Sequence, residues 1–395
     1  MSFMDQVYKK QKIAFYLPSL HLGGGEKAML DIARFLSESG VKVFLLAPDL
    51  KGPYADLIGP GIEIVPLGNQ KLSHAVGAIA SYLRKEKPDT LFSTSEHAHI
   101  VSFFARMCAR TKTRLVFRIG IPFSVLFKQY DNWRDRIFMP LLGRFIYSRA
   151  DMIIAVASGV ADDIAQVFHL DRTKIAVIHT PKDIEAIQKM AKEDPVHPWL
   201  KEKRTPVILS IGRLSVQKDF ATLLHAFART RKEKEVKLVI LGNDGGELKH
   251  LKILAKDLGI ENDVDFLGFV KNPYALLARA DLFVLTSRWE GLPNALVEAL
   301  VCGTPSIATD CIGGGSRDIL DPKGGEVKGV TEGEYGILVP TGDVKSLECA
   351  LRAVFEDGKI REYYRTRAYR GAERFSKDSI IAKYKETLLT HEQNT

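Results

Sequence analysis

Short apolar runs alternate with segments of helical period along almost the whole chain of 395 residues. The first run, KIAFYL at 12–17, leads into a segment in which Met29, Ala33 and Leu36 recur at helical spacing. Such alternation is typical of βαβ units, in which helices cover both faces of a parallel sheet. The pattern therefore predicts an α/β protein.

The predicted strands form two groups, which are separated by a charged segment at 191–204 that holds Pro195 and Pro198 and has no apolar period. The first group occupies 12–17, 42–47, 62–67, 90–94, 115–119, 152–156 and 175–179. The second occupies 207–212, 237–242, 264–269, 281–287, 305–309 and 336–340. We expect two domains, 1–190 and 205–373, a linker at 191–204, and a C-terminal helix in 374–395 that packs back on the first domain.

The cysteines are too far apart in sequence to suggest a disulfide framework or a zinc site. They are Cys108, Cys302, Cys311 and Cys349. Lysines near the N-terminus are not followed by an apolar stretch, and no run of about 18 apolar residues occurs. We therefore expect a cytoplasmic protein with free thiols that neither is secreted nor spans a membrane.

The run RWEGLPNALVE at 288–298 follows a predicted strand. It indicates a tight turn and then a helix, with Pro293 in the first turn, where its missing N–H costs nothing. Glu290 then lies at the end of the strand and Glu298 further along the helix. Carboxylates accept two hydrogen bonds at once, which suits the vicinal hydroxyls of ribose or of a sugar. An ordinary helix start with two surface glutamates is the competing interpretation, and the position after a buried strand favours binding.

The run SIGRLSVQKDF at 210–220 places two cations on the loop after the first strand of the second group. Arg213 offers a planar fork for two oxygens, and Lys218 offers a mobile point charge. Either cation alone would be an ordinary surface residue. Together, at the carboxyl end of a strand, they predict a site for a diphosphate.

Gly23, Gly24 and Gly25 open the first predicted helix. Without side chains they let the backbone approach a phosphate at a helix N-terminus. The dinucleotide fingerprint G-x-G-x-x-G is not met, because Ala28 stands at the position of the third glycine. A phosphate contact and a merely tight turn both fit the three glycines.

Several motifs together resemble the C-terminal domain of the GT4 family of retaining glycosyltransferases, which have the GT-B fold. They are IGRLSVQKDF, LGNDGG, VDFLGFV, ARADLFVLTSRWEGLPNALVEALVCGTPSIATD and YGILVPTGD. With HLGGGEKAML and SRADMIIAVASGVADDI, the resemblance covers most of the chain. It implies two Rossmann-like doubly wound domains that face each other across a cleft, the first on the acceptor side and the second binding a nucleotide-sugar donor.

The resemblance also implies roles for single residues. Arg213 and Lys218 would hold the diphosphate, Glu298 the ribose hydroxyls and Glu290 the donor sugar, and the two cations and Glu290 would be catalytic. Val270 would lie beside the nucleobase. Further donor contacts are expected at Gly23, Gly24, Gly212, Gly291, Leu292, Pro293 and Asn294.

The chain departs from the family on the acceptor side. Where the family often has a histidine on a strand of the N-terminal domain, this chain has Arg118. His97 and His99 are further acceptor-side candidates, with a capping or core position as the competing interpretation. Asp263 and Asp265 spell D-x-D, a metal motif in another glycosyltransferase fold, but here they lead into a predicted buried strand. We expect no metal and no cofactor.

Residues 101–150 hold ten Lys and Arg against only Asp131 and Asp135, and they are also rich in aromatic residues. Basic and aromatic residues interleaved on a helix suit the surface of an anionic membrane. Nucleic acid is the rival partner on charge alone. A core of aromatics beneath solvated arginines is the third interpretation. We expect the membrane, because many members of the family glycosylate lipid-linked acceptors, and no nucleic acid.

The features together predict a retaining glycosyltransferase that uses a UDP- or GDP-linked sugar. Its acceptor would be a glycan or a lipid-linked sugar in surface polysaccharide, lipopolysaccharide or glycolipid synthesis of the bacterial type, at the inner face of the membrane. A nucleotide-sugar epimerase, a phosphorylase and a non-catalytic nucleotide-sugar-binding protein are the alternatives that share the same two-domain architecture.

Overall fold

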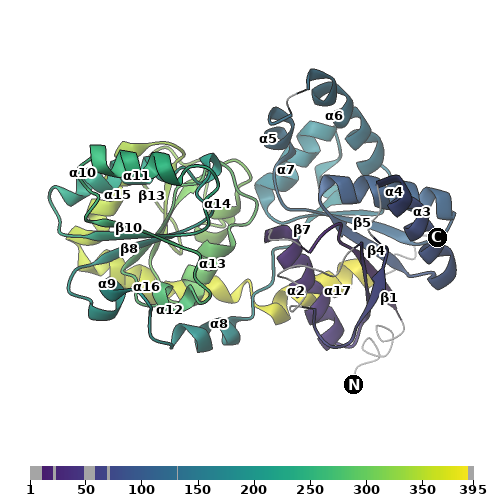
Figure 1. Cartoon of the computed structure of the whole chain (residues 1–395), viewed down its shortest axis with the longest axis horizontal. Helices are drawn as coiled ribbons and strands as arrows, with labels where there is room; N and C mark the ends of the chain where they lie inside the picture. Colours follow the sequence, from purple (N-terminus) through teal and green to yellow (C-terminus); the bar gives the residue numbers. More distant parts are fainter. Residues whose placement is uncertain (1–10, 21–23, 49–57, 69–71, 131, 390–395) are drawn as a thin grey trace. The chain divides into compact units, whose positions relative to one another are not determined.

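The computed structural model describes residues 11–20, 24–48, 58–68, 72–130 and 132–389 (Figure 1). The chain forms two compact units, one made of 1–181 with 377–395 and the other of 182–376. The segment 191–204, predicted as a linker, includes helix α9 (Pro198–Glu202), whose Leu200 is fully buried within the second unit. The chain passes between the units after Pro181 and after Ser376.

The first unit contains a seven-stranded parallel sheet in the order β3-β2-β1-β4-β5-β6-β7. Its strands are β1 (Lys12–Tyr16), β2 (Lys42–Ala47), β3 (Ile62–Pro66), β4 (Thr90–Thr94), β5 (Arg114–Ile119), β6 (Met152–Ala155) and β7 (Ile175–Val177). The strands are mostly apolar because helices cover both faces of the sheet.

Helices α5, α6 and α7 lie on one side of this sheet, and α2 and α17 lie on the other (Figure 1). The helices of the unit are α2 (Gly24–Glu38), α3 (Leu72–Glu86), α4 (Glu96–Ala109), α5 (Phe123–Lys128), α6 (Trp133–Tyr147), α7 (Ser158–Phe168) and α17 (Lys377–Leu389), with a short η2 (Arg172–Lys174). Tyr384 and Leu388 of α17 are buried in the same core cluster as Ile13 and Phe92. The C-terminal helix is thus part of the first unit.

The second unit repeats this architecture with the order β10-β9-β8-β11-β12-β14-β13. Its strands are β8 (Val207–Ile211), β9 (Lys237–Leu241), β10 (Val264–Gly268), β11 (Leu282–Leu285), β12 (Ser306–Asp310), β13 (Thr331–Glu332) and β14 (Ile337–Pro340). All are parallel except the edge strand β13, which runs antiparallel to β14. The prediction of an α/β protein with two doubly wound sheets is confirmed.

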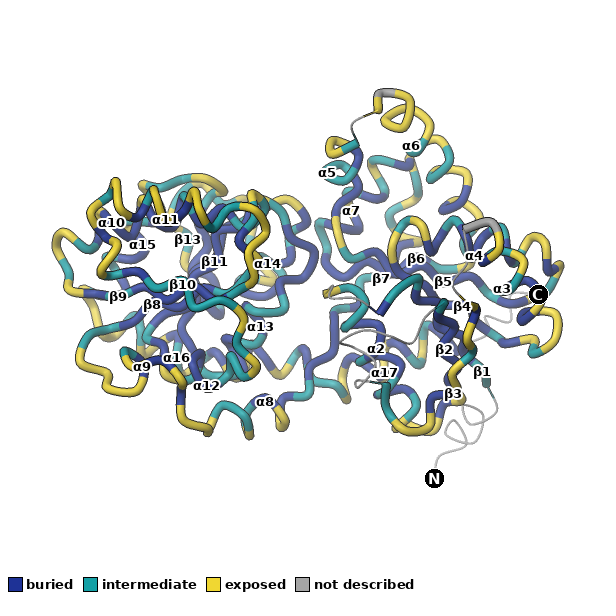
Figure 2. The backbone as a smooth tube through the Cα atoms, viewed as in Figure 1, coloured by how far each residue is buried: buried dark blue, intermediate teal, exposed yellow. Residues whose placement is uncertain are grey.

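In the second unit, α10, α11 and α15 lie above the sheet in the view of Figure 1, and α8, α9, α12 and α16 lie below it. The helices are α8 (Ile184–Ala191), α9, η3 (Val216–Lys218), α10 (Phe220–Arg231), α11 (Leu248–Asp257), α12 (Tyr274–Leu277), α13 (Asn294–Val301), α14 (Gly315–Leu320), α15 (Val344–Glu356) and α16 (Gly358–Glu373). Figure 2 shows buried strands between helices whose outer faces are exposed. No helix in the described part of the chain is long and apolar enough to cross a membrane.

Candidate active site

The site predicted from the sequence lies where the strand order of the second sheet reverses. Strand β8 has β9 on one side and β11 on the other, so the chain leaves β8 and β11 toward opposite faces of the sheet. Doubly wound sheets bind ligands at the carboxyl ends of the strands that flank such a point. The loop after β8 carries Arg213 and Lys218, and the loop after β11 carries Glu290.

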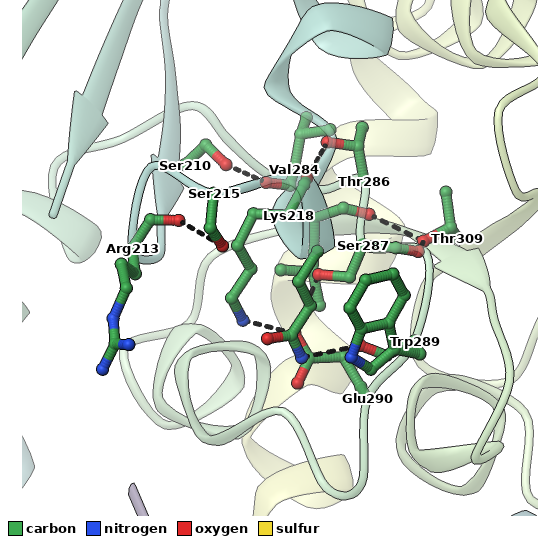
Figure 3. Close-up of polar contacts among 12 residues, drawn as sticks. Ser210, Arg213, Ser215, Lys218, Val284, Thr286, Ser287, Trp289, Glu290 and Thr309 are labelled. Carbon is green, nitrogen blue, oxygen red and sulfur yellow. Dashed lines mark hydrogen bonds and ion pairs between the residues drawn. The ribbon is translucent and has the colours of Figure 1, made fainter. Parts of the chain in front are cut away.

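Lys218 and Glu290 form an ion pair between these two loops, Nζ to Oε1 (Figure 3). The hydroxyl of Ser287 donates a second hydrogen bond to the same carboxylate oxygen, at 2.8 Å. Only 17% of the lysine side chain and 10% of the glutamate side chain are exposed. The structure therefore brings two of the predicted residues into direct contact at a half-buried position, where the charge of each offsets the desolvation of the other.

Further hydrogen bonds join the two loops. Thr286 Oγ1 donates to the carbonyl of Lys218 at 2.9 Å, and Gln217 Nε2 donates to the carbonyl of Trp289 at 2.9 Å. The N–H of Arg288 donates to the carbonyl of Gln217 at 2.8 Å. Because these bonds fix the backbone on both sides of the ion pair, its geometry does not depend on two flexible side chains alone.

Glycines bring a third loop against the loop after β8. Gly242 ends β9 with φ +145°, and a Cβ there would lie 1.9 Å from the carbonyl oxygen of Gly212. The next turn is fixed by Leu214, whose N–H donates to Asn243 and whose carbonyl accepts from Gly245. The stem of Lys218 lies directly over Gly212, where a Cβ would lie 2.9 Å from Cδ. Gly212 thus contributes space for Lys218.

The turn before α13 is held by a similar close approach. A Cβ on Gly315, the first residue of α14, would lie 1.8 Å from the carbonyl oxygen of Gly291. Pro293 was predicted in the first turn of the helix, but it is the N-cap, and α13 begins one residue later at Asn294. Leu292 is buried, and Oδ1 of Asn294 is buried without a hydrogen-bond partner among the described residues. These residues surround the start of a helix, whose first N–H groups have no partner within the helix.

Glu298 is not free. Its Oε1 accepts a 2.6 Å contact from Nζ of Lys182, and the two side chains are 12% and 9% exposed. The N–H of Lys182 donates to the carbonyl of Phe375 at 2.8 Å, which ties the lysine to the point where the chain leaves the second unit. The sequence offered no signal for Lys182, because it lies 116 residues before its partner.

Arg213 and Val270 complete the predicted set in the second unit. Arg213 is exposed and forms no side-chain hydrogen bond or ion pair with the described residues, and in Figure 3 its guanidinium points away from Lys218. Val270 is half-buried two residues after β10, and its neighbour Phe269 is 71% exposed. The guanidinium of Arg213 is therefore exposed without a side-chain partner among the described residues, whereas Lys218 is held by Glu290.

The acceptor-side candidates of the first unit differ in their surroundings. Arg118 is buried near the end of β5, where Nε donates to the hydroxyl of Tyr384 at 3.2 Å and Nη2 to that of Thr180 at 2.7 Å. His97 is exposed at the start of α4. Gly24 is exposed at the start of α2, and Gly23 lies outside the described residues.

The structure corrects the assignment of His99 as an acceptor contact. Its ring is fully buried, with Nε2 3.2 Å from the carbonyl of Ser93 and Nδ1 2.9 Å from the hydroxyl of Tyr147. Because Nε2 must donate to a carbonyl, Nδ1 accepts from the tyrosine. Burial lowers the pKa of His99 to about 3, so the ring is neutral. Both nitrogens are used within the core, and none is left for a substrate.

Both carboxylates of the D-x-D sequence are engaged by basic groups. Asp263 contacts Nζ of Lys237 at 2.6 Å and Nε of Arg231 at 2.9 Å, and Asp265 contacts Nε2 of His197 at 3.0 Å. They flank the amino end of β10, whereas the Lys218–Glu290 pair lies at the carboxyl edge of the same parallel sheet. Among the residues that the structure describes, no three His, Cys, Asp or Glu side chains are placed to hold a metal ion.

Comparison with known proteins supports a family for both units. Residues 22–186 match the model of Glycosyltransferase Family 4, and residues 192–371 match the model of Glycosyl transferases group 1. The N-acetylgalactosamine-N,N'-diacetylbacillosaminyl-diphospho-undecaprenol 4-alpha-N-acetylgalactosaminyltransferase of Campylobacter jejuni is 30% identical over 388 residues, 96% of this chain and 100% of that protein. The lipopolysaccharide core biosynthesis glycosyltransferase LpsE of Rhizobium meliloti is 32% identical over 381 residues, 93% and 96% of the two chains.

Solved structures agree on the fold. HepE of Anabaena has a TM-score of 0.77 at 23% identity, with 95% of this chain and 99% of that chain covered. The sucrose-phosphate synthase of Thermosynechococcus elongatus has a TM-score of 0.76 at 18% identity, with 96% and 98% covered. Both likenesses show the predicted GT-B fold. With its full-length relatives and its two matching family models, this chain belongs to the group 1 glycosyltransferases of family 4 and is a transferase.

Proposed function

We propose that the protein is a retaining glycosyltransferase that moves a sugar from a UDP- or GDP-linked donor to a glycan or lipid-linked acceptor in surface polysaccharide, lipopolysaccharide or glycolipid synthesis. The observation that carries the proposal is the Lys218–Glu290 pair at the reversal point of the second sheet, next to the unpaired Arg213. Two relatives support it by their names, which specify a diphospho-undecaprenol-linked acceptor and lipopolysaccharide core synthesis. HepE, solved with UDP-glucose, supports the nucleotide-sugar donor.

Departure of the nucleoside diphosphate puts negative charge on the β-phosphate. In the proposed site, Lys218 and Arg213 stabilise that charge, together with the N–H groups of Gly291, Leu292 and Asn294 at the start of α13. Lys218 is prepared for this role because its stem and backbone are already fixed, so little reorganisation accompanies the reaction. Arg213 adds a fork that can close on two phosphate oxygens.

Glu290 and Glu298 provide acceptors for donor hydroxyls. Glu290 would contact the sugar while it remains beside Lys218, and Glu298 would contact the ribose hydroxyls while it remains beside Lys182. A carboxylate paired through one oxygen still has lone pairs for a hydroxyl. Gly212 leaves room for the diphosphate grip, and Val270 would lie beside the nucleobase. Gly23 and Gly24 stay predicted phosphate contacts.

Lys218→Ala tests this assignment. Removing a preorganised charge donor from the leaving group should lower turnover by about 100-fold or more. The measurement is release of nucleoside diphosphate from a panel of UDP- and GDP-sugars, together with transfer to a lipid-linked acceptor. Lys249→Ala, on the exposed face of α11, is the matched control and should behave as the wild type. Near-normal donor hydrolysis and transfer by Lys218→Ala would remove this residue from the mechanism.

We also propose that α6 docks on an anionic membrane, which would place the enzyme peripherally at the inner face. The large apolar residues of 101–150 divide into two sets. Phe117, Phe123 and Phe127 are buried, whereas Ile137, Phe138 and Leu141 on α6 are 58%, 59% and 64% exposed. The basic residues Arg134 and Arg144 lie exposed on the same helix. An exposed apolar stripe flanked by arginines favours anionic lipid over nucleic acid, which offers no apolar surface of this kind.

Vesicle flotation tests the membrane proposal. The wild type should float with vesicles of phosphatidylcholine and phosphatidylglycerol, and should float less with phosphatidylcholine alone, because anionic lipid attracts the arginines. Phe138→Ser with Leu141→Ser should abolish flotation. Ile253→Ser, which removes an equally exposed apolar side chain from α11, is the control. Equal flotation of the double variant and the wild type would assign membrane binding elsewhere.

A further inference from the structure

Arg118 is a buried cation whose hydrogen-bond partners are both neutral. Its side chain is among the most buried charged groups of the first unit, with 2% of the residue exposed. Its guanidinium donates to the hydroxyls of Tyr384 and Thr180, and no carboxylate of the described residues pairs with it. A guanidinium has five N–H donors. The two hydroxyl contacts leave most of these N–H donors without an acceptor in the described structure. The positive charge of the guanidinium has no negatively charged partner there.

Other buried cations of the protein are compensated. Lys182 pairs with Glu298 and Lys218 pairs with Glu290, each at a mostly buried position. Arginine remains charged at any pH that a folded protein tolerates, so Arg118 cannot avoid the cost of burial by losing its proton. A purely structural link between Tyr384 and the sheet would not need a charge. The missing counter-charge therefore points to a ligand.

The position of Arg118 agrees with a ligand contact. Arg118 is the fifth residue of the six-residue strand β5. Thr180 comes shortly after the last residue of β7, a strand of the same parallel sheet. Both residues therefore lie at the carboxyl edge of the sheet. Gly120, two residues after Arg118, lies beside its Nη1, because a Cβ there would be in ordinary van der Waals contact with it at 3.8 Å. This edge is where a doubly wound sheet binds its ligand.

We propose that Arg118 binds an oxyanion, a carboxylate or a phosphate, carried by the sugar substrate of the first unit. The inference rests on the proposed function, which assigns a substrate to this unit, and it adds the chemical class of that substrate. An arginine fork matches the two oxygens of a carboxylate or phosphate, which a point charge does not. Tyr384 and Thr180 position the fork by holding Nε and one Nη2 hydrogen.

Thermal unfolding with two simple anions tests the proposal without turnover. Inorganic phosphate and D-glucuronate are the probes, with chloride at equal ionic strength as the reference. An anion bound only by the folded protein, at several times its Kd, should raise the Tm of the wild type by about 2–4 °C above the chloride value. Arg118→Met should lose this rise, and Arg149→Met, an exposed arginine of the same unit, should keep it.

Two further variants make the result decisive. Arg118→Lys keeps the charge without the fork and covers the case in which methionine prevents folding. Its apparent affinity for the effective anion should fall by about tenfold, which is the loss of one good hydrogen bond to a charged group. Tyr384→Phe removes one positioning hydrogen bond but keeps the guanidinium, so the rise should become smaller without being lost. A purely structural role for the Arg118–Tyr384 contact predicts instead that Tyr384→Phe and Arg118→Met lose the rise equally.

The two probes separate the sources of the anion. A response to phosphate alone assigns a phosphorylated substrate, and a response to glucuronate alone assigns an acidic sugar. A rise that survives Arg118→Met but disappears in Lys218→Ala places the anion at the second unit and overturns the proposal, as does no rise at all. If the wild type consumes no nucleotide sugar but keeps an Arg118-dependent rise, the proposed function fails while the anion site stands.

Discussion

The two units share the order of their first five strands but use the carboxyl edge of the sheet differently. In the second unit, the loops at the reversal point carry opposite charges, and Lys218 and Glu290 pair across it. In the first unit, Arg118 on β5 has only hydroxyl partners among the described residues, and His99 is buried in an aromatic core. The shared fold therefore sets the edge of the sheet at which a ligand is expected. The side chains at that edge decide whether their charges are paired before a ligand binds.

Gly315→Ala should have the largest effect, because it acts on the balanced site of the second unit. The added Cβ would lie 1.8 Å from the carbonyl oxygen of Gly291, so the turn that carries Glu290 must move. A displacement of about 1 Å in a catalytic group can lower a rate by about 100-fold. We expect at least that loss in transfer, measured with saturating donor and acceptor.

Gly77→Ala is the matched control in the first unit. Gly77 lies within helix α3, and an added Cβ would meet no atom within 4 Å. Alanine should therefore stabilise that helix by about 1 kcal/mol and leave turnover unchanged. Normal transfer by Gly315→Ala, with the structure otherwise intact, would show that the turn tolerates movement and that the balanced site is less rigid than its contacts imply.

The sequence predicted the secondary structure of both units closely, because the signals are local. The predicted strands 42–47 and 90–94 coincide with β2 and β4, and the others differ at their ends by a residue or two. The edge strand β13 was missed. It has two residues, Thr331 and Glu332, and no apolar period, and it exists only through its pairing with β14.

The site was predictable in its loops but not in its pairs. Motifs after β8 and β11 identified Lys218 and Glu290 separately, yet 72 residues separate them, and no local pattern reports that they meet. Lys182 was missed altogether for the same reason. His99 was assigned to the acceptor side because it follows a strand, whereas its contact with Tyr147 depends on helix α6 packing against α4. Long-range packing decided each of these outcomes.

His99 should make the first unit sensitive to acid. Burial lowers its folded-state pKa to about 3, against the ordinary value of 6.5. Below about pH 6.5 the unfolded chain binds a proton at His99 that the folded chain does not bind. The contribution of the neutral His99 ring to the free energy of unfolding is therefore complete above that pH and is lost as the pH falls toward 3. The slope should be about 1.4 kcal/mol per pH unit, measured by urea unfolding between about pH 7 and pH 5.

His99→Gln isolates this contribution. Glutamine does not titrate, so the variant should be less stable near neutral pH, because it packs less well against Phe117, but should lose less stability on acidification. The difference between the two slopes, rather than either slope alone, reports the histidine, since other groups titrate equally in both proteins. Parallel slopes would mean that the unfolded state protects the ring as well, or that the folded ring accepts a proton.

Removal of divalent metal should have the smallest effect. The leaving diphosphate needs positive charge, which a metal ion supplies in many transferases. Here Arg213 and Lys218 would supply it at the carboxyl edge of the second sheet, whereas Asp263 and Asp265 flank the opposite end of β10 and are engaged by Lys237, Arg231 and His197. We expect turnover after dialysis against EDTA to equal turnover with added Mg²⁺ or Mn²⁺. Activity that disappears with EDTA and returns with Mn²⁺ would mean that Arg213 and Lys218 do not balance the charge of the diphosphate by themselves. The contrast between a charge-balanced second unit and an unbalanced first unit would then not hold.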